Sequence, residues 1–175
     1  MAEPEFHRTN ASSAFSLHAG GDMELDLLAR PDLSDIADIS LKLLISAVLG
    51  GIVGAEREAV GKAAGLRTHM MVSLGATLFV LGPVEAGTSA GDMTRVIQGI
   101  ATGIGFVGAG TILKRKDQDQ IDGLTTAATI WFTGAIGIAV GLGRAWLAVI
   151  CAVTAWVILA IIPRIESRFR SDDKP

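Results

Sequence analysis

The sequence contains a single cysteine, Cys151, and only 19% of its 175 residues are charged, against about 25% in an average soluble domain. A single cysteine excludes a disulfide-stabilised scaffold. The formal net charge of −3, without a stripe of basic residues, excludes a nucleic-acid-binding domain. The HExxH, CxxC, GxSxG and P-loop patterns are also missing, so no common catalytic signature indicates an enzyme.

Apolar sequence is abundant: it makes up 50% of the chain and gives a mean hydropathy of +0.47. Five uncharged stretches contain 13, 17, 18, 21 and 19 residues. A helix needs about 20 residues to cross a hydrocarbon core of about 30 Å, and Lys42 can snorkel to lengthen the first stretch. We therefore predict an all-α membrane protein, a bundle of five transmembrane helices. The expected spans are 39–57, 66–84, 95–113, 123–142 and 145–163.

The two ends of the chain differ from the spans. Residues 1–31 are acidic and lack the continuous apolar stretch of a secretory signal, so we expect a mobile acidic tail there. A transmembrane domain over 32–163 and a basic cytoplasmic tail over 164–175 are expected to follow. With five crossings, ten cations fall on one side of the membrane and five on the other. Because translocation of cations is disfavoured, we predict an external N-terminus and a cytoplasmic C-terminus.

Glycine is frequent, with 21 residues, and several glycines lie four residues apart on one helix face. Helices in lipid associate mainly through close backbone packing, which such faces allow. The third expected span contains five glycines, so we expect that helix at the centre of the bundle and expect Gly103→Leu to disrupt it. The glycines assigned to helix packing are Gly50, Gly54, Gly99, Gly103, Gly105, Gly108 and Gly110.

Two kinds of chemistry are disfavoured by context. Residues 103–108 read G-x-G-x-x-G, but that dinucleotide motif requires a strand-to-helix turn and these glycines lie in an apolar run. We therefore expect no nucleotide and no other cofactor. Mg²⁺ prefers oxygen ligands that usually include carboxylates, and the central parts of the spans contain none. This disfavours a self-contained Mg²⁺ transporter, whereas a multi-subunit pore lined by carbonyls is still compatible with the sequence.

Polar residues gather at the ends of the expected spans. We expect the cytoplasmic ones to form a polar rim that binds or regulates a partner: Glu56, Arg57, Glu58, Arg67, Thr68, His69, Thr125 and Thr126. On the opposite side we expect Asp92, Arg95 and Gln98. The alternative is that these residues are interface anchors, with snorkelling cations, an i,i+4 pair of Glu58 and Lys62, and threonines that cap helices. We expect no catalytic residue and no metal site, because His69 has no second His or Cys nearby.

Four motifs resemble the MgtC/SapB family of bacterial membrane proteins: GGIVGAERE at 50–58, AGLRTHM at 64–70, GIGFVGAGTI at 103–112 and GLTTAA at 123–128. They follow the family order within residues 40–162. The resemblance implies a multi-pass protein of the bacterial inner membrane that supports growth at low magnesium and, in pathogens, survival inside macrophages. It also implies action through other membrane proteins, including the F-type ATP synthase, rather than Mg²⁺ transport. Longer members continue into a soluble cytoplasmic domain, which we expect this chain to lack.

Taken together, the residues and the resemblance predict a non-enzymatic accessory or regulatory protein linked to magnesium homeostasis. Its expected partners are the lipid bilayer and other membrane proteins, and a second copy of the chain is a further candidate. The alternative is a subunit of a channel or transporter for Mg²⁺ or another small ion. A role in virulence follows only from the resemblance.

Overall fold

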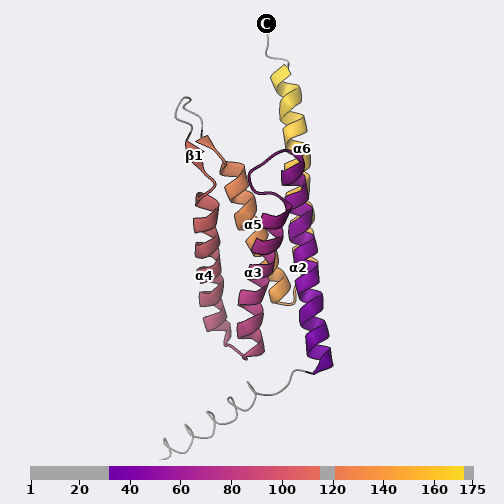
Figure 1. Ribbon diagram of the computed structural model, residues 1–175, viewed down its shortest axis with the longest axis vertical. Coiled ribbons are helices and arrows are strands. Elements are labelled where there is room, and N and C mark those ends of the chain that lie inside the picture. The colour runs from indigo at the N-terminus through magenta and orange to yellow at the C-terminus, as the bar shows by residue number, and fades with distance from the viewer. Residues whose placement is uncertain (1–31, 115–120, 172–175) are drawn as a thin grey trace, which may run out of the picture. The chain divides into compact units, whose positions relative to one another are not determined.

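A computed structural model describes residues 32–114 and 121–171 (Figure 1). These residues form five helices and one short antiparallel hairpin. The helices are α2 (Leu33–Ala59), α3 (Leu66–Glu85), α4 (Ala90–Ala109), α5 (Leu124–Gly141) and α6 (Ala145–Ser171). The hairpin pairs β1 (Leu113–Lys114) with β2 (Ile121–Asp122). The predicted acidic tail, residues 115–120 and the last four residues of the predicted basic tail lie outside the described residues.

The first turn of α2 belongs to a separate unit that ends at Ile36. In this turn, the backbone amides of Asp35 and Ile36 donate to the carbonyl oxygen of Asp32 at 3.0 and 3.1 Å. The bond from Asp35 satisfies one of the backbone donors that a helix leaves open at its start, and the bond from Ile36 is the first regular bond of the helix. All the other elements belong to the unit that begins at Ala37.

The all-α membrane-type fold is confirmed, and both ends of α4 differ from the expected span. This helix begins at Ala90 because the Oγ of Ser89 accepts a hydrogen bond from the amide of Asp92 at 3.2 Å, as an N-cap does. It ends at Ala109, and the apolar residues that follow enter the hairpin. Gly123 closes this connection with a φ of 94°, and a Cβ at this position would overlap the carbonyl oxygen of Thr111. The G-x-G-x-x-G sequence therefore lies within a helix and its C-terminal end, not at a strand-to-helix turn.

The last helix is longer than the expected span. α6 continues through Pro163 to Ser171, whereas the span was expected to end at residue 163. Proline removes one backbone donor but does not by itself end a helix, and the arginine and glutamate residues that follow are good helix formers.

Three helices are long and apolar enough to cross a membrane by length and composition: α2, α5 and the part of α6 up to Ile165. Among the described residues, α3 and α4 do not meet the same hydropathy criterion. Their glycine, hydroxyl and imidazole groups lower the mean hydropathy of segments that otherwise have the required length. The membrane-type fold thus includes three candidate spans, and five crossings stay a prediction.

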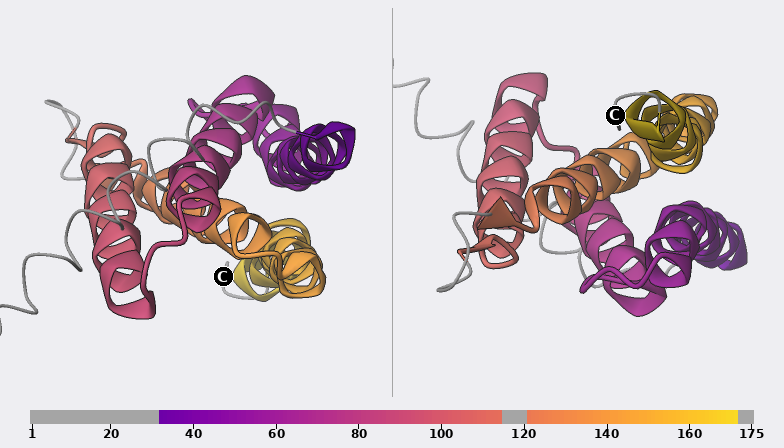
Figure 2. Two further views of the ribbon diagram at one scale, coloured as in Figure 1. Left: turned by 90° about the horizontal axis from the view of Figure 1, so that it is seen from below. Right: turned by 90° about the horizontal axis from the view of Figure 1, so that it is seen from above.

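The centre of the bundle is the pair α3 and α5. Helix α5 contacts α3, α4 and α6, and Figure 2 shows α4 on one side of the α3–α5 pair and α2 and α6 on the other. An apolar core joins α2, α5 and α6. It contains Leu49 and Val53 from α2, Ile136 and Val140 from α5, and alanines from α6. These side chains are at most 7% exposed, so they supply the apolar contacts of that half of the bundle.

Glycines let α2 and α5 approach α3 closely. A Cβ at Gly50 would lie 2.7 Å from the carbonyl oxygen of His69, and one at Gly54 would lie 2.8 Å from the Cα of Leu66. On α5, a Cβ at Gly137 would overlap the carbonyl oxygen of Ser73. Real Cβ atoms do not occupy such positions, so these three glycines are required for the observed helix spacing.

The structure differs from the sequence-based expectation at the third span. Gly99, Gly103 and Gly105 of α4 have open space where a Cβ would be, within the described part of the chain. Gly108 alone among the expected α4 packing glycines faces another helix, because a Cβ there would lie 3.2 Å from the carbonyl oxygen of Ala127 on α5. For Gly110 the nearest atom is a carbonyl oxygen of its own helix. Helix α4 is thus peripheral, and Gly99, Gly103 and Gly105 do not pack against another of the described helices.

Candidate functional site

A buried ion pair lies at the C-terminal end of α2. The carboxylate of Glu56 is bonded to the Nε and Nη2 atoms of Arg57. The side chains are only 10% and 4% exposed, respectively. A buried charge is stable only when it is paired, so this bond explains how Arg57 can lie inside the bundle.

The pair borders a cavity of about 620 Å³ formed by α2, the start of α5 and the C-terminal half of α6. We call it the rim cavity, and its lining includes Glu56, Arg57, Lys62, Thr125, Trp156 and Arg164. Three residues of the predicted rim thus meet at one cavity: Glu56, Arg57 and Thr125. Trp156 and Arg164 were not predicted as site residues, because only folding brings α6 next to the end of α2. Lys62 was expected only as a helical partner of Glu58.

Glu58 has a local structural role. Its Oε2 atom accepts a hydrogen bond from the backbone amide of Leu66 at 2.8 Å, so it satisfies a free donor at the start of α3. The bond also explains Gly65, where a Cβ would lie 2.7 Å from the same oxygen. Glu58 therefore joins α2 to α3, a contact different from the helical pair with Lys62 that its spacing allows.

His69 is fully buried between α2 and α3. Its Nδ1 atom lies 2.9 Å from the carbonyl oxygen of Gly65. A carbonyl can only accept, so Nδ1 carries the proton, and Nε2 of the neutral ring is left as an acceptor. Within the described residues, Nε2 has no hydrogen-bond partner. No group of three or more His, Cys, Asp or Glu side chains is placed to hold a metal ion in these same ranges.

Three buried hydroxyl groups connect the central helices. The Oγ of Ser46 on α2 lies 2.8 Å from the Oγ of Ser73 on α3. The Oγ1 of Thr77 lies 2.7 Å from Ser46 Oγ and 2.9 Å from the carbonyl oxygen of Gly137 on α5. This cluster was not expected from the sequence, although the four-residue repeat of His69, Ser73 and Thr77 places these three residues on one helix face.

Other predicted residues lie apart from the rim cavity. Arg67 is exposed, Thr68 is half-buried and Thr126 is buried. At the start of α4, Arg95 Nη1 donates to Asp92 Oδ1 at 3.0 Å in an exposed pair, and Gln98 is exposed one turn further along. The predicted rim is therefore divided between a cavity, a helix cap and an exposed surface.

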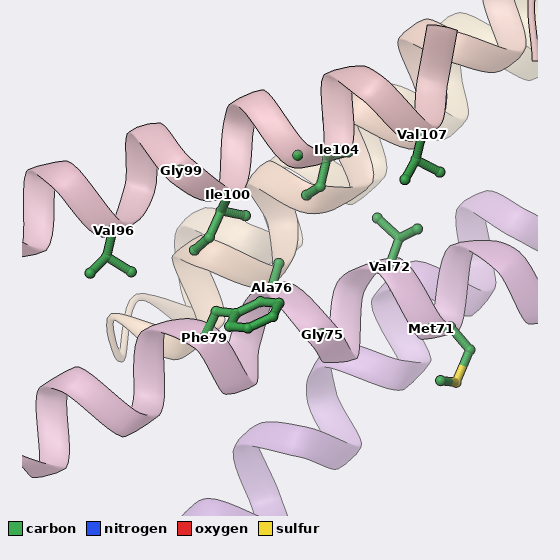
Figure 3. Close-up of a pocket in the computed structure, with 11 residues that line it drawn as sticks. Met71, Val72, Gly75, Ala76, Phe79, Val96, Gly99, Ile100, Ile104 and Val107 are labelled. Atoms are coloured by element: carbon green, nitrogen blue, oxygen red, sulfur yellow. The ribbon is translucent and has the colours of Figure 1, made fainter. Parts of the chain in front are cut away.

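A second cavity, of about 510 Å³, lies between α3 and α4 and is lined by apolar groups (Figure 3). We call it the α3–α4 groove. It is lined by Gly75, Ala76 and Phe79 from α3, and by Gly99, Ile100 and Gly103 from α4, among other residues. The open face of the α4 glycines therefore forms one wall of this groove.

Comparison with known proteins identifies the family. A model of the MgtC family matches residues 43–168. Protein SrpB of Synechococcus elongatus is 41% identical over 120 residues, which cover 62% of this chain and 66% of SrpB. The "Putative magnesium transporter YhiD" of Escherichia coli is 37% identical over 139 residues, which cover 75% of this chain and 64% of YhiD.

Protein MgtC of Salmonella typhimurium is 41% identical over 104 residues, which cover 59% of this chain and 43% of that protein. The aligned part thus spans less than two thirds of each of these relatives. No solved structure matches the chain. Because the family model matches well over half of the sequence and includes all four glycine-rich motifs, the chain belongs to the MgtC family.

Proposed function

We propose that this protein is a non-enzymatic accessory protein of the bacterial inner membrane that acts by binding other membrane proteins. A link to magnesium is supported by the family and by the name of its relative YhiD. The proposed orientation has the N-terminus outside and the C-terminus in the cytoplasm, in agreement with the excess of cations at the cytoplasmic ends.

The observation that carries this proposal is the open glycine face of α4. Gly99 and Gly103 have no atom of the described chain where a Cβ would lie, and both line the α3–α4 groove. Glycine inside a helix costs about 0.5–1 kcal/mol relative to alanine, and in membranes close helix packing usually offsets that cost. None of the described helices packs against these two glycines. A transmembrane helix of a partner protein with small side chains on one face would supply the contact.

The experiment places a photo-crosslinking amino acid at position 103 in living cells. We expect one adduct of defined mass with a membrane protein, which mass spectrometry then identifies, with the F-type ATP synthase as the first candidate. Arg67→Ala, on the exposed part of the rim, is expected to lower the adduct yield. The matched crosslinking control is Ile150, an exposed residue on α6. The same adducts from positions 103 and 150 would contradict a specific partner.

The second candidate is a subunit of a channel or transporter for Mg²⁺, which the name of YhiD favours. Inside the bundle, the hydroxyl groups of Ser46, Ser73 and Thr77 are bonded to one another and to a carbonyl, which suits helix packing better than a conducting path. Purified protein in liposomes loaded with a Mg²⁺-sensitive dye separates the two functions. An accessory protein gives the flux of empty liposomes, and any larger flux favours the transporter.

A further inference from the structure

Helix α4 has a face that contacts no other described helix. It lies at the edge of the bundle, beside α3 and α5 (Figure 2). Met93 and Ile100 of α4 belong to one apolar core with residues of α3, and Gly108 meets Ala127 of α5. The opposite side carries four residues at spacings of four, three and four, which place them on one helix face. We call this the outer face of α4, and it consists of Gln98, Thr102, Gly105 and Ala109.

The outer face is separate from the α3–α4 groove. None of its four residues is among those that line the groove, whereas Gly99 and Gly103 are. Gln98, Thr102 and Ala109 are exposed, and a Cβ at Gly105 would meet no atom of another described element. A further helix can therefore approach α4 closely on this side while the groove stays free.

Gln98 is the residue of the outer face that needs a partner. Its side-chain amide bonds to none of the described residues, whereas the hydroxyl of Thr102 donates to the backbone carbonyl oxygen of Gln98 at 2.9 Å. The expected span begins at residue 95, so Gln98 lies one turn inside it. An amide that leaves water without a hydrogen bond costs free energy, and glutamine side chains in membrane helices bond across to neighbouring helices. The Gln98 amide therefore indicates a helix contact on this face.

The chemistry of the outer face fits a second copy of this chain. Copies of a membrane protein have the same orientation, so a symmetric pair has its two-fold axis along the membrane normal, and residues near the axis meet their own counterparts. An amide has both donors and an acceptor and can bond to an identical amide, whereas a charged residue would repel its counterpart. Asp92 and Arg95, at the same end of α4, are 57% and 82% exposed and offer both signs of charge to the other copy.

We propose that two copies of this chain associate through the outer faces of α4, with their Gln98 amides hydrogen-bonded to each other and the two helices closest near Gly105. Glycine allows this close approach between helices in lipid. Lipid alone would leave the Gln98 amide unpaired. The inference goes beyond the proposed function, because it uses a different face of α4 and leaves the groove of each copy open to a partner helix.

The test compares two glycines of α4 in the full-length chain. In a Cys151→Ser background, Gly105→Cys places a thiol on the outer face, and Gly103→Cys places one in the groove. Both positions have space for a Cβ, so both variants should fold. Oxidation of native membranes should crosslink Gly105→Cys into a dimer at least about fivefold more than Gly103→Cys, because a disulfide requires the two Cα atoms to lie within about 7 Å.

Variants of Gln98 test the hydrogen bond itself. In the Gly105→Cys chain, Gln98→Leu should lower the dimer yield at least about threefold, because it removes the bond between the two amides. Gln98→Asn retains an amide and should preserve most of the yield. Single-molecule photobleaching of the full-length chain, with one fluorophore at the C-terminus, is a second readout, and we expect two bleaching steps per particle.

Any one of four results would overturn the proposal. These are equal dimer yields from Gly103→Cys and Gly105→Cys, a yield that Gln98→Leu does not change, bleaching in a single step, and a disulfide adduct of Gly105→Cys with a different protein. None of them would alter the adduct expected from the photo-crosslinker at position 103. The two-copy association and the proposed function are therefore tested separately.

Discussion

Glycine has two different roles in this chain, although the spacing of the glycines is the same. Gly50 and Gly137 lie where a Cβ would meet backbone atoms of α3. Gly99 and Gly103, also part of a four-residue repeat, face the α3–α4 groove. Spacing predicts which glycines share a helix face, but only the arrangement of the helices decides which faces meet.

This difference reverses the sequence-based expectation that Gly103→Leu disrupts the bundle, and it leads to a prediction for single residues. Gly137→Leu should lower the free energy of unfolding by at least about 1–3 kcal/mol, because its side chain must displace the Ser73 backbone. Gly103→Leu should leave stability unchanged or raise it by up to about 1 kcal/mol, through better helix propensity in open space. Thermal unfolding in detergent measures both. Equal destabilisation by the two changes would show that α4 is packed more tightly than the structure indicates.

The site residues show the same limit. Charged groups at span ends are expected from the sequence to seek partners, and three of the predicted rim residues, Glu56, Arg57 and Thr125, line the rim cavity. The inferred rim did not distinguish Glu56 from Glu58, which lie two residues apart. One carboxylate pairs with Arg57 and the other caps α3, and this division depends on where the next helix begins.

At the level of the elements, the uncharged stretches predicted five helices, and the ends of these helices depend on capping residues. Ser89 begins α4 and Gly123 precedes α5, and neither position stood out in a hydropathy pattern. The hairpin of β1 and β2 was missed because strands of two residues are too short to show periodicity. Helix type and order were predictable from long apolar runs, whereas helix ends depend on single hydrogen bonds.

The cap of α3 gives the element-level prediction. Glu58→Ala removes the acceptor of the Leu66 amide and should lower the free energy of unfolding by about 0.5–2 kcal/mol. Glu85→Ala, at the exposed C-terminal end of the same helix, is the matched control and should change stability by less than about 0.5 kcal/mol. Thermal unfolding of the two variants in the same detergent measures the difference. Equal destabilisation by Glu58→Ala and Glu85→Ala would mean that the hydrogen bond of Glu58 to the Leu66 amide does not contribute to stability.

At the level of the whole unit from Ala37, helix direction follows the order of the chain. Gly50 and Gly54 of α2 meet α3 in reverse order, at His69 and then Leu66, so these helices are antiparallel. Gly137 and Gly141 of α5 meet Ser73 and then Val80, so α5 and α3 run in the same direction. This alternation is the order that five successive crossings require, since the second and fourth spans must point the same way.

The count of crossings is nevertheless decided by α3 and α4, which are less apolar than the other helices. In lipid, buried polar groups must be satisfied internally, and the hydrogen bonds of Ser73 and Thr77 do this for two buried hydroxyl groups of α3. Five crossings place the α3–α4 turn outside the cell. If only α2, α5 and α6 cross, that turn stays in the cytoplasm, while the ends of the other three helices keep their sides.

A single cysteine at Ala86, in this turn, therefore separates the two topologies. In a Cys151→Ser background, we expect a membrane-impermeant maleimide to label Ala86→Cys on intact cells, because both neighbouring helices span the bilayer. Arg144→Cys, in the α5–α6 turn, should be labelled in the same way, and Lys62→Cys should require permeabilised cells. Labelling of Arg144→Cys together with protection of Ala86→Cys would mean that α3 and α4 do not cross. The α3–α4 groove would then face the cytoplasm, and a partner helix in the bilayer could not reach it.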